Sequence, residues 1–192
     1  MENRGFIFAG VFALLVAFSL PSAAATATPA AGEVLPDISL AMPQDQIQRA
    51  YLGLQGGDAF KIPEIKADVV IVELFSMYCP YCQKEAPTIN KLYQKIEGDP
   101  KLRNAVKIIG IGVGNSTYEV NHFRKTYDVP FPLFEDGNFA IHKQLGEVRT
   151  PYFIGIRIQS DGSHVVFYSK LGGPRDAGAM LEELIKKSGL AE

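Results

Sequence analysis

The stretch Cys79-Pro80-Tyr81-Cys82 decides the fold, and it holds the only two cysteines of this 192-residue chain. It follows the apolar, β-branched run over residues 69–75 and precedes an amphipathic stretch over residues 83–96. This order predicts a buried strand, a turn and a helix. Two thiols spaced C-x-x-C at the start of a helix can close a disulfide within one turn. The spacing therefore predicts a redox-active Cys79–Cys82 disulfide that needs no other cofactor.

The two cysteines are expected to play different parts. The attacking species is a thiolate, and Cys79 would lie at the N-terminal edge of the helix, where free N–H groups and the macrodipole favour an anion. Pro80 agrees with this placement, because a proline in the first helical turn loses no intrahelical hydrogen bond. Cys82 would face the same side and resolve a mixed disulfide formed at Cys79.

The composition is that of one globular domain with a sizeable core. The chain is 47% hydrophobic and 21% charged, with a formal net charge of −2. It has no basic cluster that would indicate nucleic-acid binding. A zinc site would need two further ligands, and the three histidines, His122, His142 and His164, are not paired in the sequence. Redox chemistry remains the leading expectation for the cysteines.

Residues 1–25 have the pattern of a secretory signal peptide. Arg4 precedes an apolar run over residues 6–20, which is short for a membrane span, and Ala23-Ala24-Ala25 offers an A-x-A-like cleavage site. Glu2 weakens the positive end, so an uncleaved membrane anchor is the alternative. A redox protein exported across the inner membrane of a bacterium would work in the periplasm.

The remaining chain divides into a flexible linker over residues 26–35 and a folded domain over residues 36–192. Strands are expected at 34–42, 60–62, 69–75, 106–113, 131–134, 152–158 and 164–170. Helices are expected at 45–54, at 80–96 with a kink at Pro87, and at 116–127, 139–145 and 176–187. The first two strands would pair as an added hairpin. The order predicts an α/β protein with a mixed sheet.

From about Pro36 to the C-terminus, the chain resembles the thioredoxin-fold oxidoreductases of the TlpA/ResA-like redoxin group. Residues 79–87 match the pattern C-x-x-C-x-x-E-x-P, and the helix and strand between Asn115 and Phe134 are similar to that group's central insertion. The resemblance implies a central mixed sheet flanked by helices, with an N-terminal β extension and a central α/β insertion. It also implies reduction of protein disulfides, including those of apocytochromes c, with a membrane electron donor or acceptor.

Two departures leave the direction of electron flow open. Tyr78 stands where the group usually has tryptophan directly before the first cysteine. The segment over residues 73–80 is similar to the approach to the active site in periplasmic disulfide oxidases, and Pro80-Tyr81 recurs in glutaredoxins and some disulfide isomerases. A reductase is the leading hypothesis, and an oxidase or isomerase of the same fold is the alternative.

Two glutamates are candidate partners of the cysteines. Glu73 falls in the middle of the predicted buried strand, where an unpaired carboxylate is costly, so its pKa should be raised. Its position matches the buried acid of thioredoxin-like enzymes, and we expect it to exchange protons with Cys82. The alternative is a glutamate that reaches solvent from the strand end. Glu85 matches the motif glutamate and would tune the cysteines or contact substrate; a solvated helix-surface glutamate is the alternative.

The substrate-binding residues are predicted from the same resemblance. Thr150-Pro151 matches the site where thioredoxin folds hold a cis-proline opposite the cysteines. The Thr150 backbone would then pair with an extended substrate segment. Tyr78, Tyr81 and Tyr152 could form an apolar rim, although a core role is equally expected for Tyr152.

Two other functions stay open. A peroxidase of the peroxiredoxin class shares the fold but needs P-x-x-x-T-x-x-C, and this chain has Val72 and Ser76 where proline and threonine are required. A Cu(I) carrier could use the two thiolates with His164, because soft sulfur ligands suit Cu(I).

Overall fold

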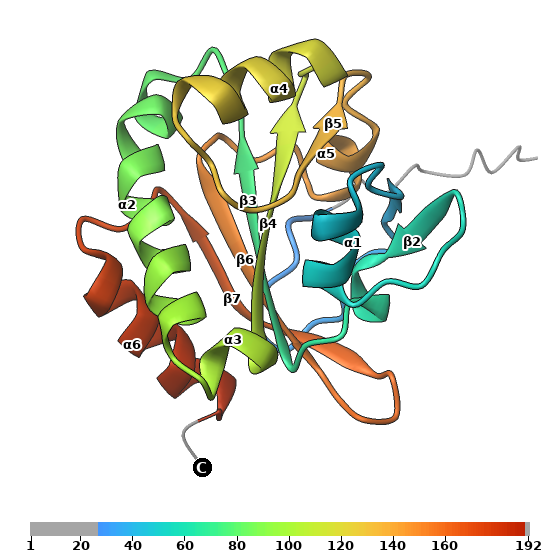
Figure 1. Ribbon diagram of the computed structural model, residues 1–192, viewed down its shortest axis with the longest axis vertical. Coiled ribbons are helices and arrows are strands. Elements are labelled where there is room, and N and C mark those ends of the chain that lie inside the picture. Colours follow the sequence, from blue (N-terminus) through green and yellow to red (C-terminus); the bar gives the residue numbers. More distant parts are fainter. Residues whose placement is uncertain (1–26, 191–192) are drawn as a thin grey trace, which may run out of the picture.

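A five-stranded mixed sheet forms the centre of the computed structural model, which describes residues 27–190 (Figure 1). The strand order is β5-β4-β3-β6-β7. The strands are β3 (Val69–Phe75), β4 (Val106–Val113), β5 (Leu133–Asp136), β6 (Tyr152–Ile158) and β7 (His164–Leu171). The first three run parallel, and β6 and β7 are antiparallel to their neighbours. The predicted α/β architecture with a mixed sheet is confirmed.

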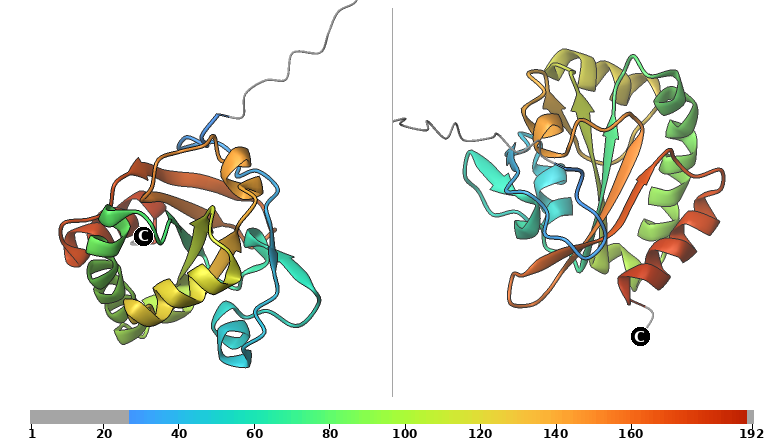
Figure 2. Two further views of the ribbon diagram at one scale, coloured as in Figure 1. Left: turned by 90° about the horizontal axis from the view of Figure 1, so that it is seen from above. Right: turned by 180° about the vertical axis from the view of Figure 1, so that it is seen from behind.

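Helices cover both faces of this sheet (Figure 1). One face packs against α2 (Pro80–Gly98), α4 (Thr117–Thr126) and α6 (Ala177–Ser188). The other packs against α1 (Gln46–Leu52), α5 (Ala140–Gln144), the 3-10 turn η1 (Ile62–Glu64) and a small antiparallel pair, β1 (Ser39–Ala41) with β2 (Ala59–Lys61). A short helix, α3 (Leu102–Ala105), leads into β4. The turn between β6 and β7 extends beyond the body of the molecule (Figure 2).

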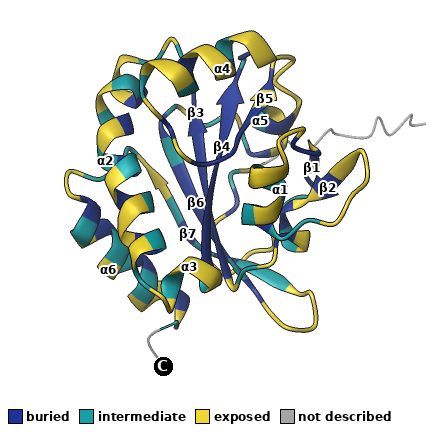
Figure 3. Ribbon diagram, viewed as in Figure 1, coloured by how far each residue is buried: buried dark blue, intermediate teal, exposed yellow. Residues whose placement is uncertain are grey.

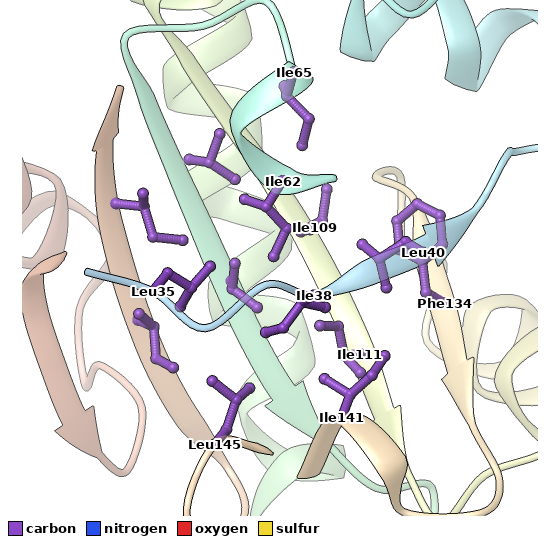
Figure 4. Close-up of a cluster of buried hydrophobic side chains, with 14 of the residues drawn as sticks. Leu35, Ile38, Leu40, Ile62, Ile65, Ile109, Ile111, Phe134, Ile141 and Leu145 are labelled. Carbon is purple, nitrogen blue, oxygen red and sulfur yellow. The ribbon is translucent and has the colours of Figure 1, made fainter. Parts of the chain in front are cut away.

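The sheet separates two hydrophobic clusters. Every residue of β3 and β4 is buried, as continuous apolar strands covered on both faces should be (Figure 3). Alternation along β3 sends Val69, Ile71 and Phe75 toward α2, and Val70 and Val72 toward the other cluster. Figure 4 shows part of that second cluster, where side chains from the N-terminal segment, the central strands and α5 meet.

The N-terminal part of the domain is tied to the sheet edge. Residues 26–35 were expected to form a flexible linker, and within this stretch Gly32 and Glu33 pair with β7 in the structure. The Gly32 N–H donates to the Val166 carbonyl at 2.8 Å, the Val166 N–H donates to the Glu33 carbonyl at 2.8 Å, and Leu35 is buried in the core. This pairing covers backbone groups of an edge strand.

The predicted signal peptide over residues 1–25 lies outside the described residues. Within residues 27–190, no helix is both long enough and apolar enough to cross a membrane.

Most element boundaries follow local signals in the sequence. Helix α4 begins with the predicted capping box, in which Ser116 and Glu119 hydrogen-bond reciprocally. Helix α1 begins after the N-cap Asp45 and ends at Gly53, which has a left-handed backbone. Helix α2 continues through Pro87 to Gly98.

The predicted pairing of β1 with β2 is confirmed, with α1 between them, but two predicted boundaries need correction and one helix was missed. Strand β1 is limited to three residues. Strand β5 begins at Leu133, two residues later than predicted, because Pro132 has no N–H to donate. Helix α3 was not predicted, since four residues are too few to show a helical period.

Candidate active site

Cys79 is the N-cap residue of α2 at the carboxyl end of β3. Its extended backbone places the sulfur over the first turn, where Sγ accepts a hydrogen bond from the Cys82 N–H at 3.4 Å. The Cys79 thiol donates to the Thr150 carbonyl oxygen, also at 3.4 Å. Both cysteines are reduced; Cys79 is half-buried, and Cys82 is fully buried. The first cysteine is therefore the one that a substrate can reach.

The surroundings separate the acidities of the two thiols. Burial would raise the pKa of Cys79, but hydrogen bonds from the Cys82 thiol and from the helix N–H groups outweigh it, and the pKa lies below its ordinary value. Burial strongly raises the pKa of Cys82, and the hydrogen bond to Cys79 and the nearby Glu73 carboxylate raise it further. Cys79 is thus suited to attack, while Cys82 stays protonated until a base acts on it.

Glu73 is buried in the centre of the sheet, and only 4% of it is exposed. It belongs to the β3 face that packs on α2, opposite Phe153 of β6. Burial raises the pKa of Glu73 to about 8, and the negative charges of Glu85 and Cys79 add to this shift. The alternative of a glutamate that reaches solvent is wrong. The Glu73 carboxylate acts electrostatically on Cys82 and helps to raise the pKa of that thiol.

Glu85 lies one turn after Cys82 and faces a loop that follows β7. Its Oε1 accepts a hydrogen bond from the Gly173 N–H at 3.1 Å, while its buried Oε2 has no hydrogen-bond partner among the described residues. Burial raises the pKa of Glu85. A side chain at Gly173 would bring its Cβ within 1.9 Å of Oε2, so it would displace the Glu85 carboxylate. The interpretation of Glu85 as a solvated surface residue is therefore wrong.

The Thr150–Pro151 peptide bond is cis, as predicted, and it is the only cis bond within residues 27–190. The Gly172 N–H donates to the Pro151 carbonyl at 2.8 Å and joins the end of β7 to this loop. A hollow of about 320 Å³ opens between the loop and the start of α2. Its lining consists of Tyr81, Glu85, Arg149, Thr150, Pro151, Leu171 and Gly172.

Of the three predicted rim tyrosines, the structure brings two to the cysteines. Tyr78 is 65% exposed and Tyr81 is 69% exposed, on either side of Cys79 in the sequence. Tyr152 instead packs on the cluster at the other face of the sheet, and its hydroxyl hydrogen-bonds the Ser169 hydroxyl at 2.9 Å. Tyr78 and Tyr81 are exposed near the cysteines, and Tyr81 also lines the hollow.

Asn115 is a site residue that the sequence reasoning missed. It is fully buried, its Oδ1 accepts a hydrogen bond from the Met77 N–H at 2.8 Å, and its Nδ2 donates to the Ser76 hydroxyl at 3.4 Å. The Tyr78 hydroxyl donates to Glu119 in the capping box of α4. We call these contacts the insertion clamp, because they hold the segment before Cys79 against the start of the insertion. A polar residue following the carboxyl end of the parallel strand β4 was the available signal.

The residues that a peroxidase or a Cu(I) carrier would need are not arranged around the cysteines. His164 begins β7, whereas Leu171 at the other end borders the site, so His164 lies about 20 Å away. Val72 faces the opposite side of the sheet, and the Ser76 hydroxyl accepts from Asn115. Within residues 27–190, no three histidine, cysteine or acidic side chains are grouped as metal ligands would be.

Comparison with known proteins agrees with this geometry. The model of the AhpC/TSA family matches residues 31–164. The chain belongs to this family. It is 28% identical to the thiol-disulfide oxidoreductase ResA of Bacillus thuringiensis subsp. konkukian over 131 residues, which are 68% of this chain and 69% of the relative. The resemblance to ResA-like redoxins is confirmed.

Solved structures confirm the thioredoxin-like fold. A protein of Chlorobium tepidum assigned as the thiol:disulfide interchange protein DsbE superposes with a TM-score of 0.60 at 16% identity, covering 84% of this chain and all of that one. The thioredoxin domain of a thiol-disulfide oxidoreductase from Bacteroides vulgatus gives a TM-score of 0.58 at 16% identity, covering 82% of this chain and 99% of that one. The family match and the relatives together make this chain a thiol–disulfide oxidoreductase.

Proposed function

We propose that this protein reduces disulfide bonds of other proteins through a Cys79–Cys82 dithiol/disulfide cycle. The observation that carries the proposal is the asymmetry of the pair: a reachable thiol of lowered pKa lies directly above a buried thiol of raised pKa. This is the arrangement that attack followed by internal resolution requires.

The reaction has two displacement steps. The Cys79 thiolate attacks one sulfur of the substrate disulfide, the substrate S–S bond breaks, and the other substrate cysteine leaves as a thiolate. Cys82 then loses its proton to the Glu73 carboxylate and attacks Cys79 Sγ, which breaks the mixed disulfide and releases the second substrate thiolate. The substrate gains two electrons, and the enzyme is left with a Cys79–Cys82 disulfide. A membrane electron carrier would reduce that disulfide again.

The electrostatics of Cys79 favour the reducing direction. The groups that lower its pKa are hydrogen-bond donors, and no lysine, arginine or histidine among the described residues contributes. Each pKa unit by which the Cys79 thiolate is stabilised makes the dithiol form about 1.4 kcal/mol more favourable, and so makes the protein more oxidising. A thiolate held only by neutral donors should be stabilised less than one beside a cation. This supports a reductase over an oxidase.

Trapping of the mixed disulfide tests the proposal. The Cys82→Ser variant should accumulate covalent adducts with disulfide-containing proteins, because no second thiol resolves the mixed disulfide at Cys79. Excess dithiothreitol should cleave these adducts. The Cys79→Ser variant is the matched control and should trap nothing. Equal trapping by both variants, or turnover of hydrogen peroxide by Cys82→Ser at the wild-type disulfide-reduction rate, would contradict a disulfide reductase.

The N-terminal sequence supports a periplasmic place of action. The apolar run over residues 6–20 with its A-x-A-like site would direct export, and the periplasm is where substrate disulfides persist. Apocytochromes c are the protein substrates that the resemblance to ResA-like proteins suggests. Fractionation of cells that produce the full chain, with N-terminal sequencing, should find a periplasmic protein starting near residue 26, or a membrane-bound one if the anchor is retained. A cytoplasmic product with an intact N-terminus would contradict this assignment.

A further inference from the structure

The hollow beside Cys79 contains a single cation, Arg149. This side chain is exposed, lines the hollow directly before Thr150, and forms no ion pair with any residue in the described part of the chain. The acid of the hollow, Glu85, accepts the Gly173 N–H through Oε1, and its Oε2 is buried without a hydrogen-bond partner among the described residues, so it forms no ion pair with Arg149. The guanidinium of Arg149 therefore lies without a counter-ion at the edge of this hollow.

The other walls of the hollow are apolar or lack a side chain. Tyr81 and Leu171 are 69% and 44% exposed, Pro151 is buried beneath them, and Gly172 leaves the loop open. Such walls exclude water from one side of a bound group, which strengthens an ion pair formed there. An exposed guanidinium beside apolar walls is suited to bind a carboxylate on a segment that covers those walls.

Thr150 lines the hollow and also contacts the reacting sulfur, so an occupant of the hollow lies near the attacked bond. Cys79 Sγ is 3.4 Å from the Thr150 carbonyl oxygen, and Arg149 is the next residue along the chain. An extended peptide advances about 3.3 Å per residue. A substrate segment that pairs with the Thr150 backbone therefore places the side chain one or two residues from its cysteine within reach of Arg149.

We propose that Arg149 makes the enzyme prefer disulfides in extended polypeptide segments that have an aspartate or glutamate within two residues of the attacked cysteine. This inference rests on the proposed function, and it adds a specificity-determining residue to it. The carboxylate pairs with the guanidinium in the encounter and in the mixed disulfide, so it accelerates the first displacement step and leaves the second unchanged.

Peptide disulfides of defined charge test the inference. Three peptides of one sequence, each linked as a symmetrical disulfide through its single cysteine, would have aspartate, asparagine or lysine next to that cysteine. The second-order rate constant for release of peptide thiol from each disulfide by the reduced full chain is measured at low and high salt. We expect the aspartate peptide to react about threefold faster than the asparagine peptide at low salt, and the difference to shrink at high salt.

Three variants separate this inference from its alternatives. Arg149→Gln should make the aspartate and asparagine peptides equal, and Arg149→Glu should favour the lysine peptide. Arg49→Gln changes the net charge equally on α1, on the other face of the sheet, and should keep the preference. If wild type reduces all three peptides at one rate, or if Arg49→Gln also abolishes the preference for the aspartate peptide, the role of Arg149 is contradicted, whereas the proposed reductase function is not. If none is reduced, the proposed function itself fails.

Discussion

Opposite acidities at Cys79 and Cys82 arise from one structural fact, the placement of the first cysteine as the N-cap of α2. There its sulfur receives the Cys82 N–H, whereas Cys82 lies beneath it in the core beside Glu73. The C-x-x-C spacing was enough to predict which cysteine attacks. Burial of Glu73 was also predictable, because a carboxylate in the middle of an apolar strand has no route to water.

Alkylation rates should report the lowered pKa of Cys79. In the reduced wild-type protein, the rate of iodoacetamide modification of Cys79, followed by peptide mass, should rise with pH and have its midpoint below the usual thiol value of about 8.5. Hydrogen-bond donors stabilise the thiolate there. Cys82 should remain unmodified over the same pH range. A midpoint at or above that of a free thiol would contradict the assigned roles.

Substitution of Glu73 by glutamine should stabilise the reduced protein at high pH. The pKa of Glu73 is raised to about 8, so the folded state holds a proton that the unfolded state has lost above about pH 4.5. Wild-type stability therefore falls as pH rises from about 4.5 to 8, by up to about 5 kcal/mol, and this slope should be absent in Glu73→Gln. Urea unfolding of both proteins at pH 5 and pH 8 measures it.

The same variant should slow resolution of the mixed disulfide, because Cys82 loses its proton acceptor. In wild type the resolution rate should rise through pH 8 as the Glu73 carboxylate forms. Identical stability slopes and identical resolution profiles for the two proteins would show that Glu73 does not ionise beside Cys82.

Elements far apart in the sequence meet at the cysteines, and these long-range contacts were harder to predict from the sequence than the individual elements. The position of the α2 N-terminus followed from local signals, and so did the capping box of α4. The insertion clamp did not, because the contact of Asn115 with Met77 joins residues 38 positions apart. The Gly173 contact with Glu85 spans 88 positions and shows no periodicity that a sequence pattern could reveal.

Loss of the Asn115 side-chain amide, which belongs to the insertion clamp, should disturb the segment before Cys79. Asn115→Ala leaves the partly buried Met77 N–H without its partner, which should cost about 1 kcal/mol of unfolding free energy and shift the pH midpoint of Cys79 alkylation. Asn121→Ala, on the exposed face of α4, is the matched control and should change neither quantity. If Asn115→Ala is less stable but the pH midpoint of Cys79 alkylation is unchanged, Asn115 has only a structural role.

The loop after β7 should tolerate no side chain at Gly173. Gly173→Ala would displace the Glu85 carboxylate and slow disulfide reduction, since a Cβ would approach Oε2 to 1.9 Å. Gly98→Ala, at the end of α2 with nothing within 4 Å of the new Cβ, is the control and should retain full activity. Equal rates of disulfide reduction for both variants would mean that the position of Glu85 does not affect the reaction.

At the scale of the whole molecule, the mixed sheet brings the first cysteine, the cis-proline loop and the insertion to one edge. The fold was predictable because β3, C-x-x-C and α2 form a continuous local signal and because a turn signal over residues 160–163 joins the strands β6 and β7. The pairing of Gly32 and Glu33 with Val166 of β7 was not predictable, since small and proline-containing residues indicate a linker and the pairing uses only backbone groups.

The reduction potential of the Cys79–Cys82 pair tests the central claim most directly. Equilibration of the full chain in dithiothreitol and glutathione buffers, with the fraction of free thiol read by alkylation and mass, gives this potential. A reductase whose thiolate is held by neutral donors should have a potential near or below about −230 mV. A value near −120 mV would make the protein an oxidase, and a pair that never interconverts in any buffer would contradict the redox cycle altogether.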